Sequence, residues 1–179
     1  INQIRDTYRN AYPRAKILAP EDSDYEPKKR LRLFHEMASN NWDSIILTHD
    51  QFGKIPQSAA VQQRIFKEML FSIEQDVETV KKLGGDISKK MLKGLEIRKK
   101  NLNTSLKEVE KRIEEKKDAG IDFLSMGIDH IFIDESHKFK NLTFTTRHNR
   151  VAGLGNTEGS QKALNMLFAI RTLQQKYDA

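Results

Sequence analysis

Residues 59–117 carry a hydrophobic repeat that restricts the fold more than any other feature of this sequence. Apolar side chains recur at alternating spacings of three and four on both sides of Gly84-Gly85, as in a coiled-coil seam. They are Phe66, Met69 or Leu70, Ile73, Val77 and Val80, then Leu92, Leu95, Leu102, Leu106, Val109 and Ile113. The glycine pair favours two antiparallel helices, about 37 and 45 Å long. We expect this hairpin to project from a smaller body.

A second segment, residues 130–139, predicts where the chemistry lies. Residues 131–133 are apolar and mostly β-branched, which is typical of a short strand buried on both faces of a parallel sheet. Asp134 and Glu135 would then leave the carboxyl end of that strand, where α/β sheets bind their ligands. One carboxylate there can hold Mg²⁺ through water, and its neighbour can orient an attacking water.

Two other interpretations of the acidic pair remain open. Acids after an apolar run also occur at the amino end of a helix, which favours negative charge. A zinc site could instead combine His130 and His137 with Asp134 and Glu135. In an extended strand, however, His130 and Asp134 lie about 13 Å apart, too far to share one metal ion. The sequence has no HExxH pair either.

Residues 131–137 resemble the second motif of superfamily-two helicases, the Walker B box of the DEAH type, with Ser136 where Ala is commoner. The continuation, residues 138–142, resembles the Swi/Snf-like branch, in which a basic residue and then Lys-Asn follow the box. Residues 150–155, followed by Gly159-Ser160, resemble the large helicase–DNA methylase proteins of phages and bacterial mobile elements.

This resemblance implies ATP and Mg²⁺ as cofactors of the intact protein, and DNA as its partner. It implies that Asp134 holds Mg²⁺ through water, that Glu135 orients or activates the attacking water, and that His137 couples the nucleotide state to the DNA side. The implied fold is an α/β domain, a partial RecA-like parallel sheet flanked by helices. Residues 1–58 and 118–179 would be its two parts, and residues 59–117 the helical-hairpin insertion.

The rest of the hydrophobic pattern agrees with an alternation of helices and strands. We expect helices over residues 1–12, 28–39, 123–127 and 162–176, and strands over residues 15–19 and 42–49. A "WDxxxxT" strand in the helicases ends near the DNA backbone, so the resemblance places Thr48 and His49 on a turn that faces nucleic acid. A plain exit from a strand into a loop is the alternative for these two residues.

The second arm of the hairpin is strongly basic. Residues 86–117 contain eleven Lys or Arg and six acids, so they contribute +5 of the formal charge of +6. Contact with phosphates would explain this excess, with Lys99, Lys100, Lys111 and Arg112 as candidates. A solvated surface and a protein-docking arm remain alternatives. The segment has no aromatic residue, which argues against base stacking.

The sequence contains no GxxxxGK[ST] motif to cradle the β- and γ-phosphates. We therefore expect an excised piece of a helicase or translocase, inactive on ATP by itself, that works with the remaining motor domains of its chain. A non-catalytic nucleic-acid or protein-binding module on the hairpin, or an accessory domain of a DNA methylase, is the alternative. No apolar run is long enough to span a membrane, and the absence of Cys fits the cytoplasm of a bacterium or an infected host.

Overall fold

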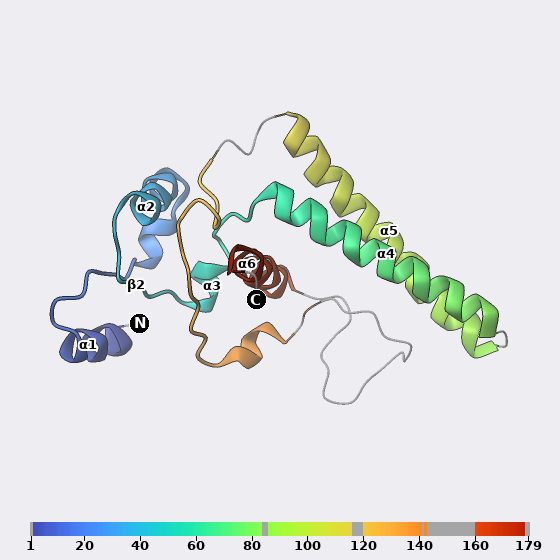
Figure 1. The fold of residues 1–179 in the computed structure, drawn as a ribbon, viewed down its shortest axis with the longest axis horizontal. Helices are drawn as coiled ribbons and strands as arrows, with labels where there is room; N and C mark the ends of the chain where they lie inside the picture. The colour runs from blue at the N-terminus through green and yellow to red at the C-terminus, as the bar shows by residue number, and fades with distance from the viewer. Residues whose placement is uncertain (1, 84–85, 116–119, 141, 143–159, 178–179) are drawn as a thin grey trace.

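The computed structural model describes residues 2–83, 86–115, 120–140, 142 and 160–177. This part of the chain is mostly helical, and a long helical hairpin projects from a smaller body (Figure 1). Its elements, in chain order, are α1 Asn2–Ala11, β1 Ile17–Leu18, the 3-10 turn η1 Asp22–Tyr25, α2 Pro27–Ser39, β2 Ser44–Ile45, α3 His49–Phe52, α4 Ala59–Leu83, α5 Asp86–Glu114, the 3-10 turn η2 Ser136–Phe139 and α6 Gln161–Tyr177. No described helix combines the length and the apolarity needed to cross a bilayer.

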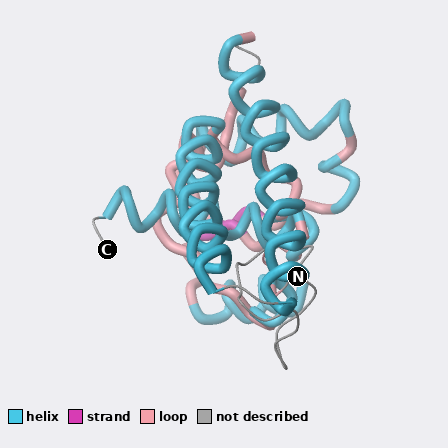
Figure 2. Tube along the Cα trace, turned by 90° about the vertical axis from the view of Figure 1, so that its right-hand side faces the viewer, coloured by secondary structure: helices cyan, strands magenta, loops and turns pink. Residues whose placement is uncertain are grey.

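The predicted helical hairpin is confirmed. α4 and α5 lie side by side in both ribbon and tube views (Figures 1 and 2). Their seam buries the predicted positions Ile73, Val80, Leu95, Leu102 and Val109. At the body end of α4, the ring of Phe66 stands edge-on to Phe168 of α6, with centroids 5.5 Å apart. The heptad pattern therefore predicted the arm, and this aromatic pair helps to fix the arm to the body.

The predicted RecA-like sheet is wrong for this chain. The described strands are one parallel pair of two residues each, with Ile17 opposite Ser44 and Leu18 opposite Ile45. Strand formation requires a neighbouring chain to take up the backbone hydrogen bonds, and an apolar run of residues does not say whether that neighbour is present. Of the strands predicted over residues 15–19 and 42–49, only Ile17–Leu18 and Ser44–Ile45 pair with each other.

The segment that carries the acidic box also differs from its prediction. Residues 131–133 form no strand in the part of the chain that is described. Ile131 and Ile133 are half-buried against the core, whereas Phe132 is 92% exposed, so the segment buries one face and not two. Upstream, residues 123–127 form turns in place of the expected short helix, and Gly127 takes a φ of 70°.

The body is held together around α2, α3 and α6. Its core combines Phe34 and Met37 of α2, Phe52 of α3 and Met166 of α6 with Phe123, which lies in the turns before the box segment. A buried amide adds a polar tie between α3 and the segment before α2. Gln51, 2% exposed, accepts a hydrogen bond from Thr48 N at 2.9 Å and donates to Asp22 Oδ1 at 2.9 Å and Pro20 O at 3.3 Å. The amino end of α3, next to the acidic box, is thereby fixed in place.

Candidate functional site

The acidic box lies where the extended segment turns into η2. Glu135 occupies the N-cap position of η2 in the left-handed region, with φ 52° and ψ 46°. Its carbonyl accepts a hydrogen bond from Lys138 N at 3.0 Å, which closes the first turn. A left-handed conformation costs a residue with a Cβ roughly 1–2 kcal/mol. The chain thus places backbone strain at the residue to which the helicase resemblance assigns the attacking water.

The side chains of the box are exposed, and two of them contact each other. His137 Nδ1 lies 2.9 Å from Glu135 Oε2, and each side chain is 58% exposed. An exposed pair of this kind adds little to the free energy of folding. Its consequence is geometric, because the imidazole restricts where the carboxylate of Glu135 points. The structure therefore brings together two of the three residues predicted to be catalytic.

The third predicted residue, Asp134, is fixed through its backbone. His49 Nε2–H donates a hydrogen bond to the carbonyl oxygen of Asp134 at 2.8 Å. The His49 ring also packs against Phe139 of η2, with centroids 5.2 Å apart and planes at 62°. Phe139 in turn stands edge-on to Phe52, at 6.2 Å and 89°. The box is thus attached to α3 by one hydrogen bond and a short aromatic row.

The position of Thr48 and His49 departs from the predicted strand exit. Thr48 is the N-cap of α3, and its Oγ1 accepts a hydrogen bond from Gln51 N at 3.1 Å. The side-chain oxygen of Gln51 in turn accepts a hydrogen bond from Thr48 N, which completes a capping box. The Thr-x-x-Gln spacing could have predicted this helix start from sequence. The contact between His49 and Asp134, 85 positions apart, has no signal in the sequence.

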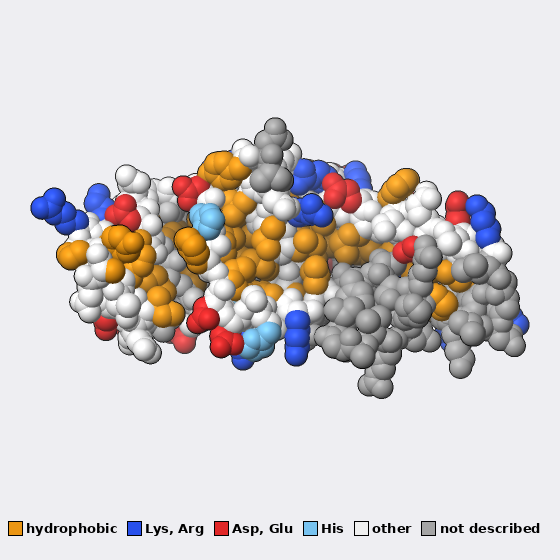
Figure 3. Space-filling model, turned by 60° about the horizontal axis from the view of Figure 1, so that its bottom comes forward, with side chains coloured by type: hydrophobic (Ala, Val, Ile, Leu, Met, Phe, Trp, Pro, Cys, Tyr) orange, Lys and Arg blue, Asp and Glu red, His pale blue; other side chains and the backbone are white. Residues whose placement is uncertain are grey.

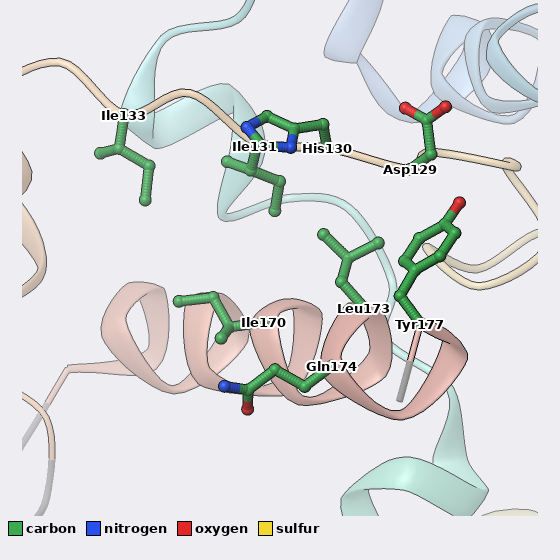
Figure 4. Close-up of a pocket in the computed structure, with 8 residues that line it drawn as sticks. All are labelled: Asp129, His130, Ile131, Ile133, Ile170, Leu173, Gln174 and Tyr177. Carbon is green, nitrogen blue, oxygen red and sulfur yellow. The ribbon is translucent and has the colours of Figure 1, made fainter. Parts of the chain in front are cut away.

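A pocket of about 590 Å³ lies behind the box segment, between residues 129–133 and α6. Its lining residues are Asp129, His130, Ile131, Ile133, Ile170, Leu173, Gln174 and Tyr177 (Figure 4). Figure 3 shows apolar side chains gathered over the middle of one face of the molecule. Asp134 and Glu135 do not line this pocket, so the predicted catalytic acids face the solvent and not the apolar cavity.

The donor set around the box suits one kind of metal and not another. Among the described residues, no group of three or more His, Asp or Glu side chains is arranged to hold a metal ion. The zinc alternative therefore finds no support there, and the ring of His130 packs against Phe132 at 4.4 Å. Mg²⁺ in phosphate-transfer sites keeps several waters and needs only one or two carboxylates beside the phosphates. The exposed carboxylate of Asp134 fits that requirement.

The predicted phosphate-contacting residues of the hairpin differ in their surroundings. Lys99 Nζ lies 2.7 Å from Glu74 Oε1, and Arg112 donates to Gln62 Oε1 at 3.1 Å, both across the hairpin. Lys111 Nζ lies 3.8 Å from Glu115 Oε1, in the residue that directly follows α5. Lys100 is exposed and forms no ion pair with any described residue. α5 packs along α4, and its carboxyl end lies at the body end of the hairpin, where Arg112 contacts Gln62 near the start of α4 (Figure 1). Among the described residues, no hydrogen bond or ion pair joins these four side chains to Thr48 or His49.

The amino end of α6 is capped by Ser160. Ser160 Oγ accepts a hydrogen bond from Ala163 N at 3.2 Å. Within the first five residues of α6, Lys162 Nζ lies 2.9 Å from Asp50 Oδ1, and Asn165 donates a hydrogen bond to Gly53 O at 2.8 Å. α6 is thereby joined to α3, the helix that holds the box. Residues 143–149, a polar run that predicts a loop, and Arg150 lie outside the described residues.

Comparison with known proteins adds one finding. A family model described as a probable helicase domain matches residues 1–179. No curated protein and no solved structure matches the chain. The match covers the body, the hairpin and the acidic box together.

Proposed function

The chain belongs to the probable helicase domain family, and from that premise we propose that it supplies the box-carrying part of a motor that couples NTP hydrolysis to nucleic acid. The observation that carries the proposal is the exposed turn at residues 134–137. There His137 is held 2.9 Å from Glu135, and the backbone of Asp134 is bonded to His49.

Each residue of the box has a role in this proposal. Asp134 would hold Mg²⁺ through water, and Glu135 would orient the attacking water with its carboxylate aligned by His137. The bound ion neutralises charge on the phosphates. The 179 residues contain no GxxxxGK[ST] loop, so the proposal requires a phosphate-binding loop from a segment outside them. By itself, the chain should neither bind nor hydrolyse ATP appreciably.

The contact between α3 and the box gives the proposal a route of coupling. Thr48 and His49, the N-cap and first residue of α3, remain proposed contacts with the nucleic-acid backbone. A shift of that turn would reach Asp134 directly, through the hydrogen bond from His49. It would also reach η2 through the contact of His49 with Phe139. Nucleic-acid binding and the position of the box would then depend on each other.

The proposal is tested in the full-length protein that contains this chain, by ATP turnover with and without nucleic acid. Glu135→Gln should lower the turnover number by about 10²–10⁴-fold while nucleotide binding survives, because the amide cannot act on the attacking water. Asp129→Asn is the matched control, an exposed acid on the same segment that should leave turnover unchanged. Turnover that Glu135→Gln leaves intact would favour the alternative, a non-catalytic binding module.

A further inference from the structure

The outer face of α5 carries a straight row of lysines, Lys93, Lys100 and Lys107, which we call the lysine row. Seven residues make nearly two helical turns, so each step advances about 10.5 Å and rotates only about 20°. All three side chains are exposed, and none forms an ion pair with a described residue. Three positive charges without an ion pair to a described residue therefore extend over about 21 Å on one side of the arm.

Several other cations of the hairpin have partners within it. Lys99 and Lys67 lie 2.7 and 3.7 Å from carboxylates of the facing helix, and Arg112 donates to Gln62. The charge is also divided unequally between the two helices. α4 has four basic and four acidic residues, whereas α5 has nine basic and five acidic residues. The ion pairs of Lys99 and Lys67 between α4 and α5 therefore do not involve the lysine row, whose charges are not needed to hold the hairpin together.

We propose that the lysine row is a contact surface for the phosphate backbone of a duplex nucleic acid, without selection of sequence. Neighbouring ammonium groups are spaced at about the Debye length in 0.1 M salt, so a small anion would contact one lysine at a time. A polyanion can contact all three and release counterions from each contact. Contacts with phosphates alone position a protein on a duplex and read no bases.

The surroundings of the lysine row favour a duplex over the other long anions. Residues 86–115 contain no aromatic side chain, so α5 itself has no platform on which unpaired bases could stack. An acidic partner helix would need an apolar stripe to pack against. The large apolar side chains exposed on the described part of α5 are Ile97 and Ile113, which lie sixteen positions apart and form no stripe. The lysine row is therefore suited to contact with phosphates alone.

This inference goes beyond the proposed function, because it requires neither ATP nor the acidic box. The arm extends away from η2 and α3, so its contact with nucleic acid would be separate from the turn at Thr48 (Figure 1). A helicase-type motor with such an arm would have a second, sequence-independent contact with its track. Loss of ATP turnover in a Glu135 variant would leave this contact unchanged, and the two hypotheses can fail independently.

The test is equilibrium binding of the 179-residue chain to a fluorescently labelled duplex DNA of about 30 base pairs, across a series of KCl concentrations. The variant is K93Q/K100Q/K107Q, in which Gln keeps the helix propensity of Lys and removes three charges. Each lost phosphate contact lowers the magnitude of the negative slope of log K against log salt by about 0.9, so we expect the slope to become less steep by about 2.7. Affinity at 0.1 M salt should fall at least tenfold.

The matched control is K28Q/K29Q/R30Q, which removes three exposed charges from α2 and leaves the arm unchanged. It should retain most of the affinity and the salt slope. An arginine variant, K93R/K100R/K107R, should bind as the unmodified chain does, and circular dichroism shows whether each variant keeps its helices. An unchanged slope in the glutamine variant would overturn the proposal. So would an equal loss in the α2 control, or equal affinity for single-stranded and duplex DNA in the unmodified chain.

Discussion

Replacement of His49 tests how firmly the acidic box is held to α3. His49→Phe keeps a ring against Phe139 but loses the hydrogen bond to the carbonyl of Asp134. A hydrogen bond of this kind contributes about 0.5–1.5 kcal/mol. His49→Ala also loses the edge-on ring contact, worth about another 0.5–1.5 kcal/mol. The population in which the box is detached should rise about two- to twelvefold in the first variant and about five- to 150-fold in the second.

Limited proteolysis with trypsin measures that population. Lys138 and Lys140 lie within and directly after η2, and their cleavage rate follows the fraction of molecules in which the turn is open. Mass spectrometry separates these cuts from cuts elsewhere. His35→Ala is the control, because His35 is exposed on α2, away from the box. If His49→Ala leaves the cleavage rate at Lys138 unchanged, the contact does not hold the box, and the proposed coupling loses its basis.

Two further predictions concern the strain at the box and the tie between α3 and α6. Glu135→Gly should be more stable to urea than Glu135→Ala by about 1 kcal/mol, because only glycine adopts a φ of 52° without a Cβ clash; a more stable alanine variant would contradict the strain. The hydrogen bond and the charge of Lys162 lower the pKa of Asp50 from its ordinary 3.8, so the stabilisation from this pair is complete above that pH and is lost as pH falls through the lowered pKa. Lys162→Gln should return the Asp50 pKa toward its ordinary value in a carboxyl NMR titration, and an unchanged pKa would show that Lys162 is not the cause.

Periodicity along the chain predicted the two long helices and α6 well, but it missed α3 and placed a helix at residues 123–127, which form turns. The seam positions from Ile73 to Val109 and the stripe of α6 recur at helical spacing, and helices form their hydrogen bonds within themselves. The glycine pair predicted two antiparallel helices, which α4 and α5 are, and the pattern over residues 162–176 predicted α6. These elements depend on neighbours a few residues away, which a single sequence displays.

The strands failed for the opposite reason. The run at residues 131–133 favours an extended backbone, but a strand exists only where a second chain segment lies beside it. Phe132, expected in a buried sheet, is 92% exposed, because no described segment covers its face. The sequence could place acids after an apolar run, and it could not show which side of that run would be buried.

Local chemistry and the two long helices were therefore determined by the sequence itself. Its order of residues set the acidic box, the basic second arm and the heptad seam. Only the tertiary structure decided that His49 holds the box and that Lys99 and Arg112 have partners across the hairpin. It also decided that the lysine row has no ion pair with a described residue. Pairing between groups 25 to 85 positions apart depends on how whole helices pack, and no short-range pattern records it.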